Sequence, residues 1–204
     1  MRGIRSTVIA FMMVAFTTGA SAQVVLCLGD SLTEGYGVAR EEAWPFVAER
    51  ELRKKHPAIR VINAGVSGST SASGPSRLAW QLKSKPVPEI MILALGANDG
   101  LRGQKVGALA ENLRKTIAAA RAGGIKKIIL AGMKMPPNYG PKYTNEYDAV
   151  FPEVAKSEKV SFIPFLIDGV AGKSELNLAD GIHPNAAGHR VISKTVINEL
   201  EKHL

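Results

Sequence analysis

Short apolar segments alternate with helix-period segments along the chain from Gln23 to the C-terminus. The apolar segments are rich in Val, Ile and Leu, as expected of strands that are covered on both faces of a parallel sheet. We expect five strands: Val24–Leu28, Ile59–Asn63, Ile90–Leu95, Lys127–Ala131 and Val160–Ile163. Strands that alternate with helices in this way predict an α/β protein with a doubly wound sheet.

Apolar residues within 44–52, 106–117 and 192–200 each fall on one helical face, and we expect a helix to contain each set. Pro45 lies near the start of the first, where its missing N–H costs little. The second ends before Gly123-Gly124, and Pro184 should begin the last. We expect Trp44 and Trp80 both to be core residues, since both have apolar neighbours on helical segments.

The start of the chain has the pattern of an export signal. Arg2 and Arg5 precede an apolar run at residues 8–16, and Ala20-Ser21-Ala22 forms a small-residue cleavage site. We therefore expect a signal peptide at residues 1–22 and one mature domain at residues 23–204, periplasmic or secreted. An uncleaved anchor is the alternative, but the run is shorter than the ~20 residues that a spanning helix needs.

Charge and cysteine content narrow the possible partners. Lys and Arg number 26 against 18 acidic residues, a formal charge of +8, and removing Arg2 and Arg5 leaves 24 − 18 = +6. The cations are scattered without interleaved aromatic residues, so we expect no nucleic-acid partner. Attraction to anionic substrates or membrane surfaces stays open. Cys27 is the only cysteine, so we expect a buried strand residue and no intramolecular disulfide.

The clearest chemical signal follows the first strand. Gly29-Asp30-Ser31 puts a serine hydroxyl in a tight strand-to-helix turn, and the turn directs the Ser31 N–H toward the space where an oxyanion would form. Taken alone, the same tripeptide also fits a helix N-cap without chemistry. In a parallel sheet, ligands bind beyond the carboxyl ends of the strands, so the other strand-end loops decide between these interpretations.

Those loops contain the partners that a nucleophilic serine needs. The small-residue loop at 63–70 offers the Gly68 N–H, and Asn98 after the third strand offers a side-chain donor. Near the end of the chain, Asp180 stands three residues before His183 in a turn, so its carboxylate can reach the imidazole. This pattern predicts a serine triad in which His183 takes the proton of Ser31 and Asp180 fixes its tautomer.

Four blocks together resemble the SGNH, or GDSL-type, hydrolase family. They are Gly29-Asp30-Ser31-Leu32, the Gly68 loop, Gly96-Ala97-Asn98-Asp99 and Asp180-Gly181-Ile182-His183. The resemblance spans Val24 to about Leu200 and is strongest to the bacterial esterase and thioesterase branch, with further matches at residues 34–37, 43–45, 96–103 and 137–140. It implies a flavodoxin-like three-layer α/β/α sandwich with a five-stranded parallel sheet in the order 2-1-3-4-5.

The resemblance also implies how the residues act. Ser31, His183 and Asp180 would form the triad, and the oxyanion hole would comprise the Ser31 and Gly68 amides with the Asn98 side chain. No cofactor and no metal are implied, and the histidines lack the spacing of a metal motif. We expect a monomer without a stable membrane anchor that acts on small-molecule esters and thioesters, such as aryl esters, acyl-CoAs and lysophospholipids.

Two alternatives remain at this point. A carbohydrate O-acetyl esterase of the same fold would use the same catalytic residues, and a non-catalytic anion-binding protein would use only the turn before Ser31. The apolar loops after the third and fourth strands favour an alkyl chain over a sugar. We expect substrate contacts from Leu101, Met135, Pro136 and Tyr139.

Overall fold

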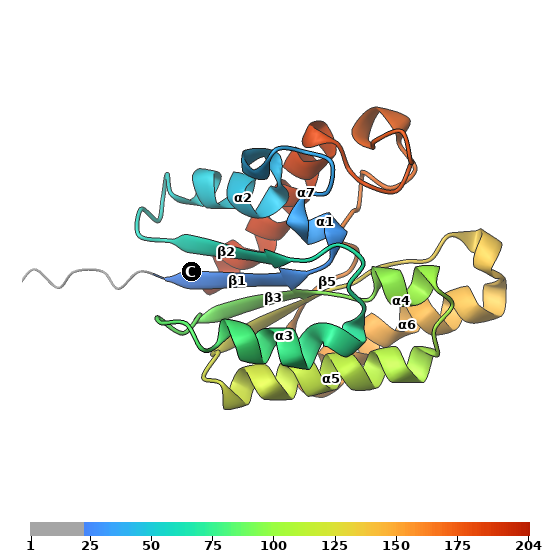
Figure 1. The fold of residues 1–204 in the computed structure, drawn as a ribbon, viewed down its shortest axis with the longest axis horizontal. Coiled ribbons are helices and arrows are strands. Elements are labelled where there is room, and N and C mark those ends of the chain that lie inside the picture. The colour runs from blue at the N-terminus through green and yellow to red at the C-terminus, as the bar shows by residue number, and fades with distance from the viewer. Residues whose placement is uncertain (1–22) are drawn as a thin grey trace, which may run out of the picture.

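The computed structural model describes residues 23–204 as three layers, with a five-stranded sheet between two layers of helices (Figure 1). All strand pairs are parallel, in the order β2-β1-β3-β4-β5. This confirms the expected fold class and strand order. The strands are β1 (Val24–Gly29), β2 (Arg60–Gly65), β3 (Ile90–Ala94), β4 (Lys127–Ala131) and β5 (Ser161–Ile163).

Seven α-helices connect and cover these strands in the described part of the chain. The three that the sequence predicted are α2 (Trp44–Leu52), α5 (Val106–Ala122) and α7 (Ala186–Leu200). Two more were anticipated without bounds, by the strand-to-helix turn at Ser31 and the helical segment around Trp80, and these are α1 (Ser31–Glu34) and α3 (Gly74–Gln81). The sequence analysis did not identify α4 (Ala97–Leu101) and α6 (Pro141–Glu158).

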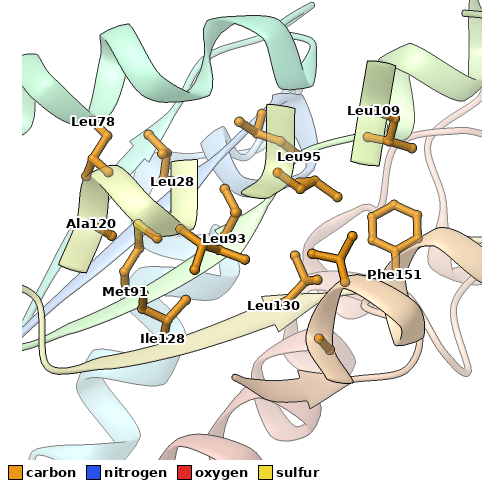
Figure 2. Packing of buried hydrophobic residues seen from close by; sticks show 14 of the residues in the cluster. Leu28, Leu78, Met91, Leu93, Leu95, Leu109, Ala120, Ile128, Leu130 and Phe151 are labelled. Carbon is orange, nitrogen blue, oxygen red and sulfur yellow. The ribbon is translucent and has the colours of Figure 1, made fainter. Parts of the chain in front are cut away.

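Each face of the sheet has its own core. Side chains of β1, β3 and β4 pack against α3, α5 and α6 on one face, where Leu93 of β3 and Phe151 of α6 are fully buried or nearly so (Figure 2). The opposite face packs against α2 and α7, with Trp44 and Val196 among the buried residues. Burial of a single large apolar side chain stabilises the fold by about 1.5–3 kcal/mol, so the central strands are held firmly in register.

Cys27 is buried in β1 as expected, and burial raises the pKa of its thiol. Two local predictions are wrong. Trp80 is 65% exposed on α3 instead of buried, because this helix packs Leu78, and not Trp80, into the core against the sheet. The last helix begins at Ala186 rather than Pro184, because the Asn185 side chain caps it by accepting the N–H groups of its first turn.

Within residues 23–204, no helix is both long enough and apolar enough to cross a membrane. The predicted signal peptide at residues 1–22 lies outside the described residues.

Gly65 lets the first helix lie directly on the end of β2. A Cβ at this position would lie 2.1 Å from the backbone nitrogen of Glu34, a distance that no real side chain tolerates. Because Glu34 ends the same short helix that begins with Ser31, this close approach fixes where the serine lies relative to the sheet.

We predict that Gly65→Ala lowers the free energy of unfolding by about 1–3 kcal/mol, because backbone must shift to admit the methyl group. Urea unfolding measures the change. The matched control is Gly107→Ala in α5, where a Cβ meets nothing within 4 Å and the better helix former should raise stability by up to ~1 kcal/mol. Equal effects of the two substitutions would contradict the steric argument.

Candidate active site

Ser31 begins α1 immediately after β1, at the carboxyl edge of the sheet. The preceding Asp30 caps this helix, since its carboxylate accepts the Leu32 N–H at 3.0 Å. Burial raises the pKa of Asp30 to about 6. The helix lasts four residues and ends at Gly35, whose φ of +90° closes the turn. Ser31 is thus held on a tight turn whose first backbone N–H groups have no partner within the helix.

The Ser31 hydroxyl lies in a hydrogen-bonded chain with a histidine and an aspartate. The Nε2 atom of His183 is 3.0 Å from Ser31 Oγ, and its Nδ1 atom is 2.7 Å from Asp180 Oδ2. An ionised carboxylate can only accept hydrogen bonds, so Nδ1 carries the imidazole proton. In the neutral imidazole the Nε2 lone pair therefore faces the serine, and the Ser31 hydroxyl donates to it.

Asp180 is fixed by its own turn. Its Oδ1 atom accepts the backbone N–H of His183 at 3.0 Å and that of Ile182 at 2.9 Å. The His183 backbone N–H, the His183 side chain and the Ile182 N–H lower the pKa of Asp180 to about 2. The carboxylate is consequently ionised throughout the neutral range. Tyr36 packs against the other side of the imidazole, with 4.5 Å between the ring centroids.

His189, in the first turn of α7, has a different environment from His183. It is fully buried on α7, and its Nδ1 accepts the Trp44 backbone N–H at 3.3 Å. Burial lowers the pKa of His189 to about 4, so this imidazole is neutral. It belongs to the packing between α2 and α7.

Three hydrogen-bond donors predicted for an oxyanion hole follow three adjacent strands. Ser31 follows β1, Gly68 follows β2 and Asn98 lies in α4 after β3. Within residues 23–204, no acceptor engages the N–H of Ser31 or of Gly68. Asn98 Nδ2 donates to the Ser69 carbonyl at 3.0 Å, and an amide nitrogen has a second N–H to offer.

A cavity of about 530 Å³ opens beside the serine, within the ~300–1,000 Å³ typical of small-molecule sites. Ser31, Asn98 and His183 line it, and most of the remaining wall is apolar. Of the predicted substrate contacts, Leu101, Met135 and Pro136 line the cavity. Tyr139 does not; its hydroxyl instead donates to the Leu101 carbonyl at 3.2 Å.

The sequence analysis missed the part of the wall that follows β5. Phe165, Ile167 and Ile182 all line the cavity, together with the small residues Ala171 and Gly172. Their apolar character in a strand-end loop was the available signal, because such loops frame the sites of parallel sheets. Lys134 lies at the same wall with its ammonium 5.5 Å from the centre of the Phe165 ring.

The structure shows no group of three or more His, Cys, Asp or Glu side chains placed to hold a metal ion among residues 23–204. The groups beside Ser31 are amide N–H donors, which suit a carbonyl oxygen, and the Nε2 atom of His183, which suits a proton.

Comparison with known proteins gives a consistent result. Residues 27–191 match the model of the GDSL-like Lipase/Acylhydrolase family. The chain is 39% identical to Esterase TesA of Pseudomonas aeruginosa over 175 residues, which cover 86% of each protein. It is 32% identical over 191 residues to Thioesterase 1/protease 1/lysophospholipase L1 of Escherichia coli, covering 94% of this chain and 89% of the relative.

The fold is similar as well. The crystal structure of TesA superposes with a TM-score of 0.84 at 37% sequence identity, covering 89% of this chain and all of that one.

The cavity wall leads to a prediction for ligand binding. Leu101 is 38% exposed at the cavity, so Leu101→Ser removes apolar contact without opening the core. We expect roughly three- to tenfold weaker binding of octanol, as the loss of part of a leucine's burial predicts. Isothermal titration measures the affinity. Val66→Ser is the control, because Val66 is 50% exposed and does not line the cavity; equal weakening in both variants would place octanol elsewhere.

Proposed function

The chain belongs to the GDSL-like lipase/acylhydrolase family, and we propose that it hydrolyses carboxylic esters and thioesters with Ser31 as its nucleophile. The observation that carries this proposal is the hydrogen-bonded chain from Asp180 through His183 to Ser31. A serine hydroxyl is a weak nucleophile until an adjacent base takes its proton, and His183 is placed to be that base.

The first half of the reaction forms an acyl-enzyme. Ser31 Oγ attacks the carbonyl carbon while its proton passes to His183 Nε2, and Asp180 stabilises the resulting imidazolium. The carbonyl oxygen becomes an oxyanion as the tetrahedral intermediate forms. When that intermediate collapses, the C–O or C–S bond breaks, and His183 returns the proton to the departing alcohol or thiol.

The second half releases the acid. A water molecule gives a proton to His183 Nε2 and attacks the acyl carbon, and a second tetrahedral intermediate forms. His183 then protonates Ser31 Oγ as it leaves. We propose that the N–H groups of Ser31, Gly68 and Asn98 bind the oxyanion in both steps, where fixed donors act without reorganisation.

The apolar cavity supports acyl chains of several carbons as substrates. Each methylene that the cavity buries contributes at most about 0.8 kcal/mol, which favours longer acyl groups over acetyl. The similar proteins carry the names esterase, thioesterase and lysophospholipase. We therefore propose aryl esters, acyl-CoAs and lysophospholipids as the substrate class.

The proposal extends to where the protein acts and to its oligomeric state. Residues 1–22 contain first charged, then apolar, then small residues, and this order supports export to the periplasm or beyond. One chain supplies Ser31, His183 and Asp180, so a monomer is sufficient for the reaction.

The test of this function is a panel of aryl esters, acyl-CoAs, lysophospholipids and acetylated sugars, assayed with the wild type and Ser31→Ala. We expect activity of the wild type to rise with acyl length from acetyl over several carbons. Ser31→Ala should fold and lose nearly all turnover, since it lacks only the attacking oxygen. Faster turnover of acetylated sugars than of any acyl-CoA or lysophospholipid would favour a carbohydrate esterase, and full activity of Ser31→Ala would exclude this nucleophile.

Asn98→Ala tests the oxyanion hole separately. Removing one side-chain donor should lower kcat by roughly 10²–10³, because the hydrogen bond strengthens only as charge develops on the oxygen. KM should change little. Steady-state kinetics with an aryl ester measures both constants; an unchanged kcat with a raised KM would make Asn98 a ground-state contact instead.

A further inference from the structure

The loop at residues 67–71, called here the Gly68 loop, is held by side chains that come from outside it. Each of four of its residues exchanges a backbone hydrogen bond with a different side chain. The pairs are Ser67 N–H to Glu34 (2.7 Å), Gly68 C=O to Arg102 (3.0 Å), Ser69 C=O to Asn98 (3.0 Å) and Ser71 N–H to Asp99 (2.8 Å). The conformation of this loop is therefore set by side-chain contacts rather than by a strand or helix ladder.

Three of the four side chains come from α4 and the residue after it, which are Asn98, Asp99 and Arg102. The same helix carries the side-chain donor proposed for the oxyanion hole. The Gly68 amide and the Asn98 amide thus lie on two segments that are bonded directly to each other. Their relative position depends on these contacts.

Asp99 makes the most buried of these contacts. Its side chain is 2% exposed, and its two oxygens accept the Ser71 N–H and, at 2.5 Å, the Ser71 hydroxyl. Asn112 of α5 donates to the same hydroxyl at 3.0 Å. Two hydrogen bonds from one residue to the same carboxyl group add geometric specificity as well as energy. Asp99 does not line the cavity beside Ser31, so it fixes the loop without a place to touch substrate.

Arg102 acts on the glycine itself. Gly68 has a φ of +76°, in the left-handed region that glycine adopts readily because it has no Cβ. Arg102 binds its carbonyl, and Glu34 binds the N–H of the residue before it. The peptide unit between them carries the Gly68 N–H, so an anchored group on each side determines where this N–H points.

We propose that Asp99 and Arg102 are positioning residues that direct the Gly68 N–H at the oxyanion by fixing the Gly68 loop. This inference rests on the proposed esterase function. The new element is that α4 and the residue after it determine the position of the Gly68 N–H in the oxyanion hole. They do so through side chains that contact no reacting atom. Misplacement of a catalytic group by ~1 Å can lower a rate by ~10²-fold, so loosening the loop should slow the chemical step.

The experiment compares Asp99→Asn, Arg102→Gln and the control Arg114→Gln, which changes an exposed arginine of α5. Four quantities are measured in each, besides the melting temperature: kcat and KM for a soluble aryl ester, the affinity for 1-butylboronic acid, and the affinity for octanol. The boronic acid forms an anionic tetrahedral adduct with the serine oxygen and so mimics the intermediate. Octanol reports only on the apolar cavity.

We expect kcat to fall by roughly 10–100-fold in Asp99→Asn and by roughly 3–10-fold in Arg102→Gln. These losses are no larger than the roughly 10²–10³-fold loss expected when a whole oxyanion donor is removed. The boronic acid affinity should fall by the same factors, while KM and the octanol affinity stay unchanged. Arg114→Gln should match the wild type in all measurements. A contact that only stabilises the fold would lower the melting temperature without this parallel loss.

Folded variants that keep the wild-type kcat and boronic acid affinity would overturn the inference. A raised KM with unchanged kcat would overturn it as well, because Arg102 would then contact substrate. If Asp99→Asn does not fold, the exposed Arg102→Gln variant decides. A wild type that hydrolyses no ester would instead refute the proposed function, so the two failures are distinguishable.

Discussion

The parallel register of the three strands β2, β1 and β3 is the constraint on which the site depends. It places Gly29 at the end of β1 opposite Gly65 of β2 and Ala94 of β3, so the three strands end together. Whatever follows these strands must emerge at the same edge. Ser31, the Gly68 loop and Asn98 follow them within a few residues, and the two cores on either face hold the register in place.

The base reaches this edge by a different route. His183 follows β5 by a long connection, in which Asn177 and Pro184 form an isolated antiparallel bridge and Asp180 binds two backbone N–H groups. The turn is therefore held by its own local contacts and not by the serine. Because the turn needs only hydrogen bonds within residues 180–183, the pair of Asp180 and His183 can be identified from the sequence alone.

The sequence predicted the features that depend on local pattern or on strand order. Continuous apolar runs identified all five strands, and a single turn identified the pair of Asp180 and His183. Features that depend on how distant segments pack were missed. Trp80 was expected in the core because its neighbours are apolar, and the cavity wall at Phe165 and Ile167 was overlooked because only the folded loop brings it to the serine. Tyr139 was expected to line the cavity, but in the folded loop it contacts Leu101, which lines the cavity itself.

The central claim is that Ser31 is activated by His183 and attacks the substrate. A fluorophosphonate probe reacts with such serines, because its phosphorus mimics the carbonyl carbon and its oxygen occupies the oxyanion site. Mass spectrometry of the digested adduct then identifies the modified residue. The account predicts one probe per chain on Ser31, with the rate reduced strongly in Asp180→Asn. Labelling of Ser67 or Ser69 in the neighbouring loop, with Ser31 unmodified, would contradict it.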